Sequence, residues 1–267
     1  MNNQITIGYL SWKRNKILTQ TLNSHNNNGL FDIIPPQNRT IFFQEIHKTD
    51  IITATKYHCN YFGDNNNIGI LNGFIKLVES CKTEYFIFCE NDWYLVENKD
   101  TTNKIIDDCI NLLHSNQADI IKLRSRKSPG NPLYSRPTNV NEWLSQNYSG
   151  FPYKLESLSW LNEPNKTYNN LLDEYDGNYK WYITSLKHQS WSNNVFICKT
   201  CYLHDIILPL LKTDIVKNLE NYTGLEDILV KYNNYIGINS YIDSIIENYK
   251  KTKIAGGEGL FEHKDFI

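Results

Sequence analysis

The stretch EYFIFCENDWYL, residues 84–95, runs a nearly continuous apolar segment into two carboxylates, Glu90 and Asp92, with Trp93 directly behind them. Strands covered on both faces, as in parallel sheets, have such unbroken apolar runs. Ligands of open parallel sheets bind at the carboxyl ends of the strands. We therefore expect a buried strand over 84–89 that delivers both carboxylates to a ligand-binding edge of a sheet.

Upstream of this stretch, strand-like and helix-like patterns alternate. We predict strands over 4–10 and 39–46 and helices over 16–25 and 65–81. Strands and helices in this order are typical of βα units that build a parallel sheet with right-handed crossovers. The build is Rossmann-like, but the sequence contains no G-x-G-x-x-G motif and so does not indicate a dinucleotide site.

Downstream of the stretch the periodicity is less regular. We predict strands over 118–125 and 193–198 and helices over 102–115, 204–211 and 225–235. From 125 to about 192 the periodicity fades while tryptophans accumulate, which favours an ordered, functional insertion. The glycines of KIAGGEGLFEH, residues 253–263, predict a turn before the last residues. No repeat or linker divides the chain, so we expect a single α/β domain.

Composition narrows the classes of function. The formal net charge of -2 at pH 7 indicates no basic surface for nucleic acid. No stretch approaches the roughly 20 apolar residues of a transmembrane helix, and the first residues lack a signal-peptide pattern. We therefore expect a cytoplasmic protein, or one of the host cytoplasm if the source is a virus with an AT-rich genome.

The six cysteines are spread along the chain, at Cys59, Cys81, Cys89, Cys109, Cys198 and Cys201. A chain of this length does not need disulfides to hold a core, so we expect the cysteines to be reduced and buried. Cys198 and Cys201 form a C-x-x-C pair, but no second pair of ligands lies at a zinc-site spacing. We interpret them as a strand cysteine followed by a turn cysteine.

Glu90 and Asp92 are candidate metal ligands. Two carboxylates at positions i and i+2 beyond a strand repel one another and resist burial unless a cation compensates them. Mg²⁺ and Mn²⁺ accept carboxylate oxygens together with substrate phosphates, and they need only one or two protein carboxylates. The alternative for a lone E-x-D is a solvated turn.

The order of motifs resembles that of nucleotide-sugar glycosyltransferases of the GT-A fold, in particular the family 2 type. IGYLSWKR is similar to the opening strand and loop of that family, FFQEIHKTD to the acidic end of its second strand, NNNIGILNG to its helix entry, and FIFCEND to its D-x-D motif. The resemblance implies a GT-A-like, mostly parallel central sheet flanked by helices, in a single domain over 1–267. Residues up to about 105 would bind the nucleotide sugar and 106–267 the acceptor.

The resemblance also assigns a metal site. It implies that Asp92 ligates Mn²⁺ or Mg²⁺ on the donor diphosphate, while Glu90, in place of the usual first Asp, lies near the ribose or the metal. The segment GLFEHKD resembles a common ending of the family, in which the histidine completes the metal site. His263 is therefore the third expected ligand, and an imidazole suits Mn²⁺ better than Mg²⁺. The alternative for His263 is the cap of a surface turn.

The same resemblance implies that Tyr9, Ser11 and Glu45 line the nucleoside pocket and that Asp64 contacts the base. Packing at a strand end is the alternative for Tyr9 and Ser11, and a helix-entry role is the alternative for Asp64. Trp93 is the tryptophan best placed to contact donor or acceptor. Four further tryptophans, Trp143, Trp160, Trp181 and Trp191, suit stacking on a sugar ring, with core filling as the alternative.

Two further groups of charged residues are candidates for the chemistry. GLEDILVKY resembles the family's E-D motif, which implies that Asp227, or else Glu226, is the catalytic base. Acids at the start of a helix are held ionised by its dipole, although they are favoured there in any case. Arg124, with Arg126 and Lys127 beside it, is expected to steady the diphosphate, and a solvated basic loop is the alternative.

These assignments predict a glycosyltransferase that moves a sugar from a nucleotide diphosphate sugar, with UDP-sugar favoured, to the hydroxyl of a glycan or other acceptor. Transfer would be inverting and metal-dependent, in glycan or glycoconjugate synthesis. The first alternative is a metal-dependent sugar nucleotidyltransferase, although SWKRN lacks the usual glycine. The second is a non-catalytic nucleotide-sugar or glycan-binding protein. A glycoside hydrolase is disfavoured because Glu90 and Asp92 are too close in sequence to flank a glycosidic bond.

Overall fold

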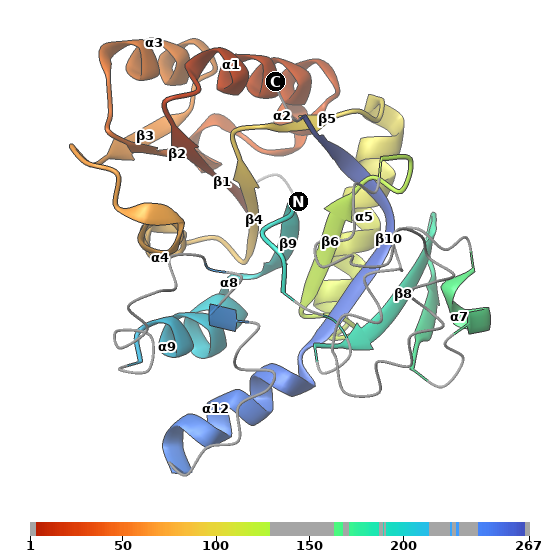
Figure 1. Ribbon diagram of the computed structural model, residues 1–267. Helices are drawn as coiled ribbons and strands as arrows, with labels where there is room; N and C mark the ends of the chain where they lie inside the picture. Colours follow the sequence, from red (N-terminus) through yellow and green to blue (C-terminus); the bar gives the residue numbers. More distant parts are fainter. Residues whose placement is uncertain are drawn as a thin grey trace, which may run out of the picture.

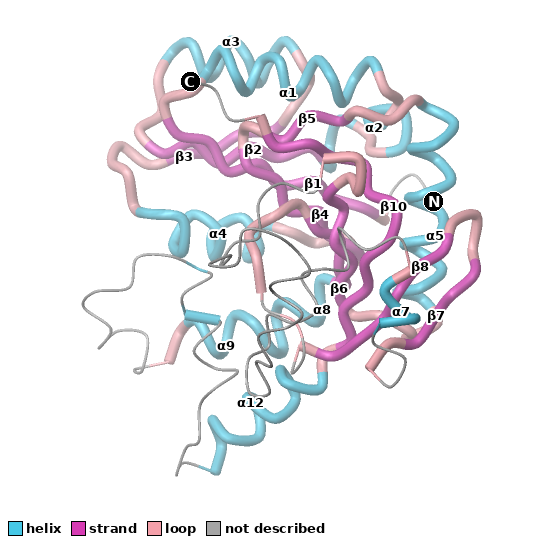
Figure 2. The backbone as a smooth tube through the Cα atoms, turned by 45° about the vertical axis from the view of Figure 1, so that its right-hand side comes forward, coloured by secondary structure: helices cyan, strands magenta, loops and turns pink. Residues whose placement is uncertain are grey.

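A mixed ten-stranded sheet runs through the part of the chain that the computed structural model describes, which is residues 4–128, 163–167, 171–186, 189, 191–213, 225, 228–229 and 240–264. The strand order is β3-β2-β1-β4-β9-β6-β10-β8-β7, and β5 pairs with β10. Helices lie on both sides of the sheet, with α1 and α3 above it and α4, α9 and α12 below it in Figures 1 and 2.

The N-terminal half of the sheet is parallel and follows the predicted order of elements. Its elements are β1 (Ile5–Trp12), α1 (Asn15–Asn27), α2 (Leu30–Ile33), the 3₁₀ helix η1 (Pro36–Asn38), β2 (Arg39–Gln44), α3 (Lys48–Lys56), β3 (Asn60–Gly63), α4 (Gly69–Ser80) and β4 (Tyr85–Glu90). β1 pairs in parallel with both β2 and β4, and β2 pairs in parallel with β3. The strands at 84–89, 4–10 and 39–46 are therefore confirmed, whereas α3 and β3 were not predicted.

The second half of the sheet is mixed. Its elements are β5 (Trp93–Leu95), α5 (Lys99–His114), β6 (Ile120–Arg124), α7 (Pro164–Thr167), β7 (Asp173–Asp176), β8 (Lys180–Ser185), β9 (Phe196–Lys199), α8 (Thr200–Tyr202), the π-helical turn η3 (Leu203–Ile207), α9 (Leu208–Leu211), α12 (Ser240–Lys251) and β10 (Lys253–His263). β9 is antiparallel to both β4 and β6, so β6 runs in the same direction as β4. The hairpin of β7 and β8 lies in the stretch for which no strand was predicted.

Each face of the sheet carries its own hydrophobic core. The first core includes Ile7 and Tyr9 of β1, packed with residues of α1 and α5. The second core includes Leu10 of β1, packed with residues of α4 and η3. Neighbouring residues of a strand point to opposite faces, so Tyr9 and Leu10 enter different cores. This two-sided burial explains why the strands lack alternation between apolar and polar residues.

The C-terminal strand β10 corrects the prediction of a glycine-rich turn. It is an eleven-residue strand that lies between β6 and β8 and then pairs with β5. Its register against β6 shifts between Gly256 and Phe261. A Cβ on Gly259 would overlap the carbonyl oxygen of Arg124. The glycines therefore permit a close approach of two backbones inside a continuous strand, and the strand carries His263 to Trp93 of β5.

All six cysteines are free; five are buried and Cys201 is exposed. None of the six takes part in a disulfide, and the predicted burial holds for all but Cys201. In the described ranges no helix combines the length and the apolar character that crossing a membrane requires.

Candidate functional site

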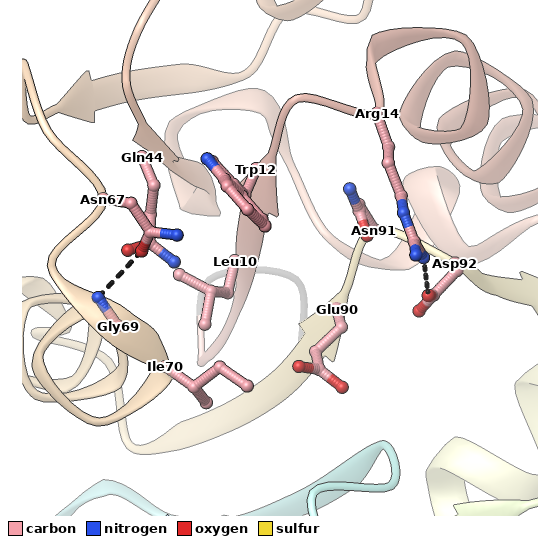
Figure 3. Close-up of a pocket in the computed structure, with 10 residues that line it drawn as sticks. All are labelled: Leu10, Trp12, Arg14, Gln44, Asn67, Gly69, Ile70, Glu90, Asn91 and Asp92. Carbon is pink, nitrogen blue, oxygen red and sulfur yellow. Dashed lines mark hydrogen bonds and ion pairs between the residues drawn. The ribbon is translucent and has the colours of Figure 1, made fainter. Parts of the chain in front are cut away.

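A pocket opens where the parallel strands β1, β2 and β4 end. It encloses about 380 Å³ and is lined by Leu10, Trp12, Arg14, Gln44, Asn67, Gly69, Ile70, Glu90, Asn91 and Asp92. Figure 3 shows these residues converging from the three strand ends and from the start of α4. The position is the one at which open parallel sheets bind ligands, because the carboxyl ends of neighbouring strands and the loops beyond them meet there.

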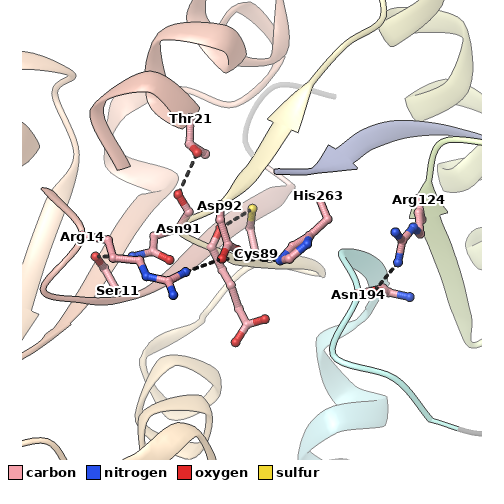
Figure 4. A network of polar contacts seen from close by, with 10 residues as sticks. Ser11, Arg14, Thr21, Cys89, Asn91, Asp92, Arg124, Asn194 and His263 are labelled. Atoms are coloured by element: carbon pink, nitrogen blue, oxygen red, sulfur yellow. Dashed lines mark hydrogen bonds and ion pairs between the residues drawn. The ribbon is translucent and has the colours of Figure 1, made fainter. Parts of the chain in front are cut away.

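Asp92 is the centre of a charged cluster at one end of this pocket. It is 8% exposed, and its Oδ2 accepts a hydrogen bond from Nη1 of Arg14 at 3.1 Å. The same oxygen lies 3.4 Å from Nε2 of His263. The other oxygen, Oδ1, is buried and has no hydrogen-bond partner in the described part of the chain. Asp92 thus joins the end of β4 to the end of β10, as Figure 4 shows.

The loop that carries Asp92 is fixed on both sides. The carbonyl oxygen of Asn91 accepts a hydrogen bond from the hydroxyl of Thr21 at 2.7 Å, and the Asn91 amide donates to the hydroxyl of Ser11 at 3.4 Å. The carbonyl oxygen of Asp92 accepts one from the backbone N–H of Lys264 at 3.1 Å. α1, β1 and the residue after β10 therefore all hold this loop in place.

His25 of α1 supports the same loop from the first core. Its Nε2 lies 2.9 Å from the carbonyl oxygen of Trp93, and its Nδ1 lies 2.6 Å from the hydroxyl of Tyr9. A carbonyl only accepts, so Nε2 carries the proton and the Tyr9 hydroxyl donates to Nδ1. Burial lowers the pKa of His25 to about 4, which keeps the ring neutral.

Tyr9 therefore belongs to the core and not to the pocket. It is fully buried, and burial raises the pKa of its hydroxyl well above the usual value. This placement corrects the expected nucleoside contact, because strand alternation turns Tyr9 away from the face on which Leu10 reaches the pocket. Ser11 is 2% exposed, its hydroxyl accepts a hydrogen bond from the Asn91 amide, and it is not among the lining residues.

Glu45 lies beside the pocket and orients one of its walls. Nζ of Lys13 lies 2.8 Å from Oε2 of Glu45, and this hydrogen bond, with one from the Trp12 indole, holds the pKa of the Glu45 carboxyl below its usual value. Lys13 and Glu45 both have a φ of 55°, a backbone conformation that side chains other than glycine rarely adopt. Trp12 itself is 44% exposed and lines the pocket. The turns at Lys13 and Glu45 therefore hold the Trp12 ring at the edge of the pocket.

Two side-chain amides line the far end of the pocket in fixed orientations. Oε1 of Gln44 accepts from the backbone N–H of Ile68 at 2.9 Å, and Oδ1 of Asn67 accepts from that of Gly69 at 2.9 Å. These two bonds fix the orientation of each amide, in which the NH₂ group is the donor end. Asp64 is not among the lining residues and pairs instead with Lys76 at 3.2 Å, which lowers the pKa of the Asp64 carboxyl.

Arg124 and Trp93 stack on one another beside the cluster. The guanidinium of Arg124 lies 5.3 Å from the ring centroid of Trp93, and the Trp93 and His263 rings are 5.0 Å apart. Arg124 donates to the carbonyl of Ser128 at 3.1 Å, and neither Arg124 nor Trp93 is among the residues that line the pocket. Trp93 is only 2% exposed, so it supports His263 and offers little surface to a ligand.

None of the remaining predicted residues that the structure describes lines the pocket. Trp181 and Trp191 are 0% and 2% exposed, which corrects the expectation of sugar stacking for these two in favour of core filling. Lys127 pairs with Glu97 at 2.7 Å. Trp143, Trp160, Glu226 and Asp227 lie outside the described residues.

Several pocket residues were missed from the sequence. Arg14, Trp12, Gln44 and Asn67 stand inside the quoted motifs, but nothing in their spacing indicates which of them face the ligand. Asn67 and Asn91 are further hidden by the abundance of Asn in the chain. The loop geometry that turns Arg14 onto Asp92 is a tertiary feature without a local sequence signal.

The described residues contain no group of three or more His, Cys, Asp or Glu side chains close enough to hold a metal ion. Asp92 and His263 form a pair, and Glu90 and Asp92 point in different directions in Figure 3. Glu90 is half-buried and lines the pocket.

The sheet order and the site at its carboxyl edge define a GT-A-like fold. A search against protein-family models found no match, and no curated protein sequence matched the chain. Solved structures confirm the fold class: Staphylococcus aureus TarS, residues 1–349, is similar with a TM-score of 0.53 and 12% identity over 99% of this chain and 60% of that chain. The chain thus spans less than two thirds of the TarS structure.

Two ligand complexes have the same fold. The TarS complex with UDP-GlcNAc is similar with a TM-score of 0.51 and 13% identity, over 100% of this chain and 59% of that chain. Glucosyl-3-phosphoglycerate synthase from Mycobacterium tuberculosis, in complex with Mn²⁺, UDP-glucose and phosphoglyceric acid, is similar with a TM-score of 0.50 and 9% identity, over 99% of this chain and 73% of that chain. At such identities the likeness concerns the fold.

Proposed function

We propose that this protein is a glycosyltransferase that moves a sugar from a nucleotide diphosphate sugar to an acceptor hydroxyl. One observation carries the proposal. The pocket at the carboxyl ends of β1, β2 and β4 has Asp92 at one side, and His263, at the end of the last strand, lies 3.4 Å from Asp92. Solved structures of the same fold bind UDP-GlcNAc or UDP-glucose, which supports a UDP-sugar as donor.

The pocket suits the parts of such a donor. The exposed ring of Trp12 offers an aromatic face to a base, and the NH₂ groups of Gln44 and Asn67 offer donors to its edge. Arg14 and Asp92 stand at the other end, where a diphosphate would lie. We assign Glu90 to the ribose, because Asp92 and not Glu90 meets His263.

Asp92 and His263 would hold the divalent ion. Their donor set, one carboxylate and one imidazole, fits Mn²⁺ and to a lesser degree Mg²⁺, and the buried, unpartnered Oδ1 of Asp92 is an atom that a cation would satisfy. When bound, such an ion supplies positive charge to the departing diphosphate. The complex of the similar synthase with Mn²⁺ supports this assignment.

The acceptor side rests on the sequence motif alone. We keep Asp227, or else Glu226, as the base that takes the proton from the acceptor hydroxyl, and both lie outside the described residues. A base on the acceptor side would support in-line attack with inversion. The acceptor would be a glycan or another hydroxyl compound, bound mainly by the part of the chain beyond about 105.

A thermal-shift screen tests the function. A ligand at a hundred times its Kd stabilises a protein by about 2.7 kcal/mol, so we expect one class of nucleotide diphosphate sugar to raise Tm in the presence of Mn²⁺. No shift with any nucleotide sugar would overturn the proposal. A thermal shift without any release of nucleoside diphosphate in a donor-hydrolysis assay would indicate a non-catalytic binding protein. If release occurs and Asp227→Asn leaves it unchanged, Asp227 is not the base.

A further inference from the structure

The guanidinium of Arg14 occupies the approach to Asp92. Nη1 of Arg14 donates to Oδ2 of Asp92 at 3.1 Å, the oxygen that also faces His263 at 3.4 Å. The side chain of Arg14 is 57% exposed, whereas that of Asp92 is 11% exposed. The Asp92 carboxylate is therefore buried and held in place, whereas the Arg14 guanidinium belongs to a largely exposed side chain.

We propose that Arg14 is an exchangeable counter-ion of the site: it neutralises Asp92 while no divalent ion is bound, and it turns to the donor's diphosphate when one binds. This inference rests on the proposed function, because it takes Asp92 as a metal ligand. It adds a positioning role for Arg14 and a link between metal binding and donor binding.

The exchange follows from the charges around one carboxylate. A divalent ion held by Asp92 and His263 would leave the guanidinium next to a like charge of twice its size. The repulsion falls with distance, and Arg14 can move because its side chain is largely in solvent. Asp92 cannot follow, because Thr21 and Lys264 hold the backbone on either side of it.

The pocket offers Arg14 a second position. Arg14 lines the cavity together with Trp12, Glu90 and Asn91, so its guanidinium can turn toward a ligand without leaving the site. A guanidinium binds phosphate oxygens through two parallel N–H donors, which a lysine ammonium does not offer. Metal binding would thus free the Arg14 guanidinium to bind the diphosphate. The divalent ion and the donor would therefore bind with positive cooperativity.

Mn²⁺ and UDP titrations of the full chain separate the two halves of the exchange. In Arg14→Gln we expect Mn²⁺ to bind about 2- to 5-fold more tightly without nucleotide, measured by the electron paramagnetic resonance of free Mn²⁺, because the competing cation is gone. At saturating Mn²⁺ we expect UDP to bind about 10-fold more weakly in calorimetry, because a phosphate ligand is gone. The two affinities move in opposite directions.

Lys16→Gln is the matched control. Lys16 is exposed, lies two residues along the chain and is not among the lining residues, so the same loss of charge should leave both affinities unchanged. Arg14→Lys keeps the charge and should return Mn²⁺ affinity toward that of the wild type.

Three outcomes would overturn the inference while the proposed function stands. They are unchanged or weaker Mn²⁺ binding in Arg14→Gln, unchanged UDP binding in that variant, and equal effects in Lys16→Gln. A wild-type protein that binds neither Mn²⁺ nor any nucleotide sugar of the thermal-shift screen would instead remove the proposed function, and the inference with it.

Discussion

At the scale of single residues, the site depends on the surroundings of one carboxylate. The hydroxyl of Thr21 in α1 donates to the carbonyl of Asn91, and the N–H of Lys264 donates to the carbonyl of Asp92, so the backbone is held on either side of Asp92. The Asp92 side chain faces Arg14 and His263 through one oxygen. Glu90, two residues earlier, enters the pocket without joining that group. The i, i+2 spacing therefore places the two carboxylates in different surroundings, and only Asp92 meets His263.

His263→Ala tests the metal assignment. Loss of an imidazole ligand is expected to weaken Mn²⁺ binding by at least about tenfold, the lower limit for changes even in residues that only support a ligand. Isothermal titration of the full chain with Mn²⁺ measures the change. His204→Ala, which removes an exposed histidine of the η3 turn, is the control and should bind Mn²⁺ as the wild type does. An affinity unchanged in His263→Ala excludes His263 as a ligand.

At the scale of elements, the hairpin of β7 and β8 is anchored by one buried acid of α5. Asp108 is 1% exposed and accepts hydrogen bonds from the backbone N–H groups of Asn178 and Tyr179 at 2.8 and 2.9 Å and from the indole of Trp181 at 3.0 Å. The carboxylate accepts from the N–H donors of the turn between β7 and β8. A helix thereby fixes the edge of the sheet.

Asp108→Ala should destabilise the protein by about 3–5 kcal/mol, because it leaves buried N–H donors without an acceptor. Chemical denaturation followed by circular dichroism measures the change. The neighbouring Asp107 is only partly buried, so Asp107→Ala removes the same charge and should cost less than about 1 kcal/mol. Equal costs for the two variants would show that the hydrogen bonds to Asp108 are not the cause.

The elements also show what sequence patterns can predict. The apolar strands and the acids at their ends could be located because burial on both faces leaves a local signature, as in 84–92. The hairpin at Asp173–Ser185 could not, because its outer strand is polar and its anchor, Asp108, is distant in sequence. The glycines of 253–263 predicted a turn, but Gly259 instead permits a close approach of β10 to the backbone of Arg124. Tyr9 and Arg14 needed the tertiary structure, since their partners lie on other elements.

At the scale of the whole molecule, the sheet and its two cores join both halves of the chain. β4 of the first half is followed in the sheet by β9, β6 and β10 of the second, so the expected donor and acceptor parts share one sheet. His25 of α1 lies in the first core, where its ring is hydrogen-bonded to the hydroxyl of Tyr9 and to the carbonyl of Trp93. Its protonation should therefore affect the stability of the whole fold.

The free energy of unfolding should fall as the pH is lowered from about 6.5 to 4. The unfolded chain takes up a proton at His25 near its ordinary pKa of 6.5, whereas the folded protein holds it neutral down to a pKa of about 4. The loss amounts to about 3 kcal/mol across this window. Urea unfolding at a series of pH values measures it.

The variants that check this pH dependence replace two histidines in turn. His25→Gln should be less stable than the wild type at pH 7 and should vary less between pH 6.5 and 4, because the buried titrating group is gone. His114→Gln removes an exposed histidine and should keep the wild-type dependence. A slope that persists in His25→Gln would assign the effect to other groups.

The long path of β10 to the site has a consequence for biosynthesis. Asp92 leaves the ribosome about 170 residues before His263, which at about 5–20 residues per second is a delay of roughly ten to thirty seconds. During that interval the nascent chain holds the carboxylate and Arg14 but not the imidazole. The two proposed ligands come together only when β10 has been synthesised and has entered the sheet beside β5. Under the proposed metal assignment, capture of a divalent ion therefore belongs to the end of folding rather than to its beginning.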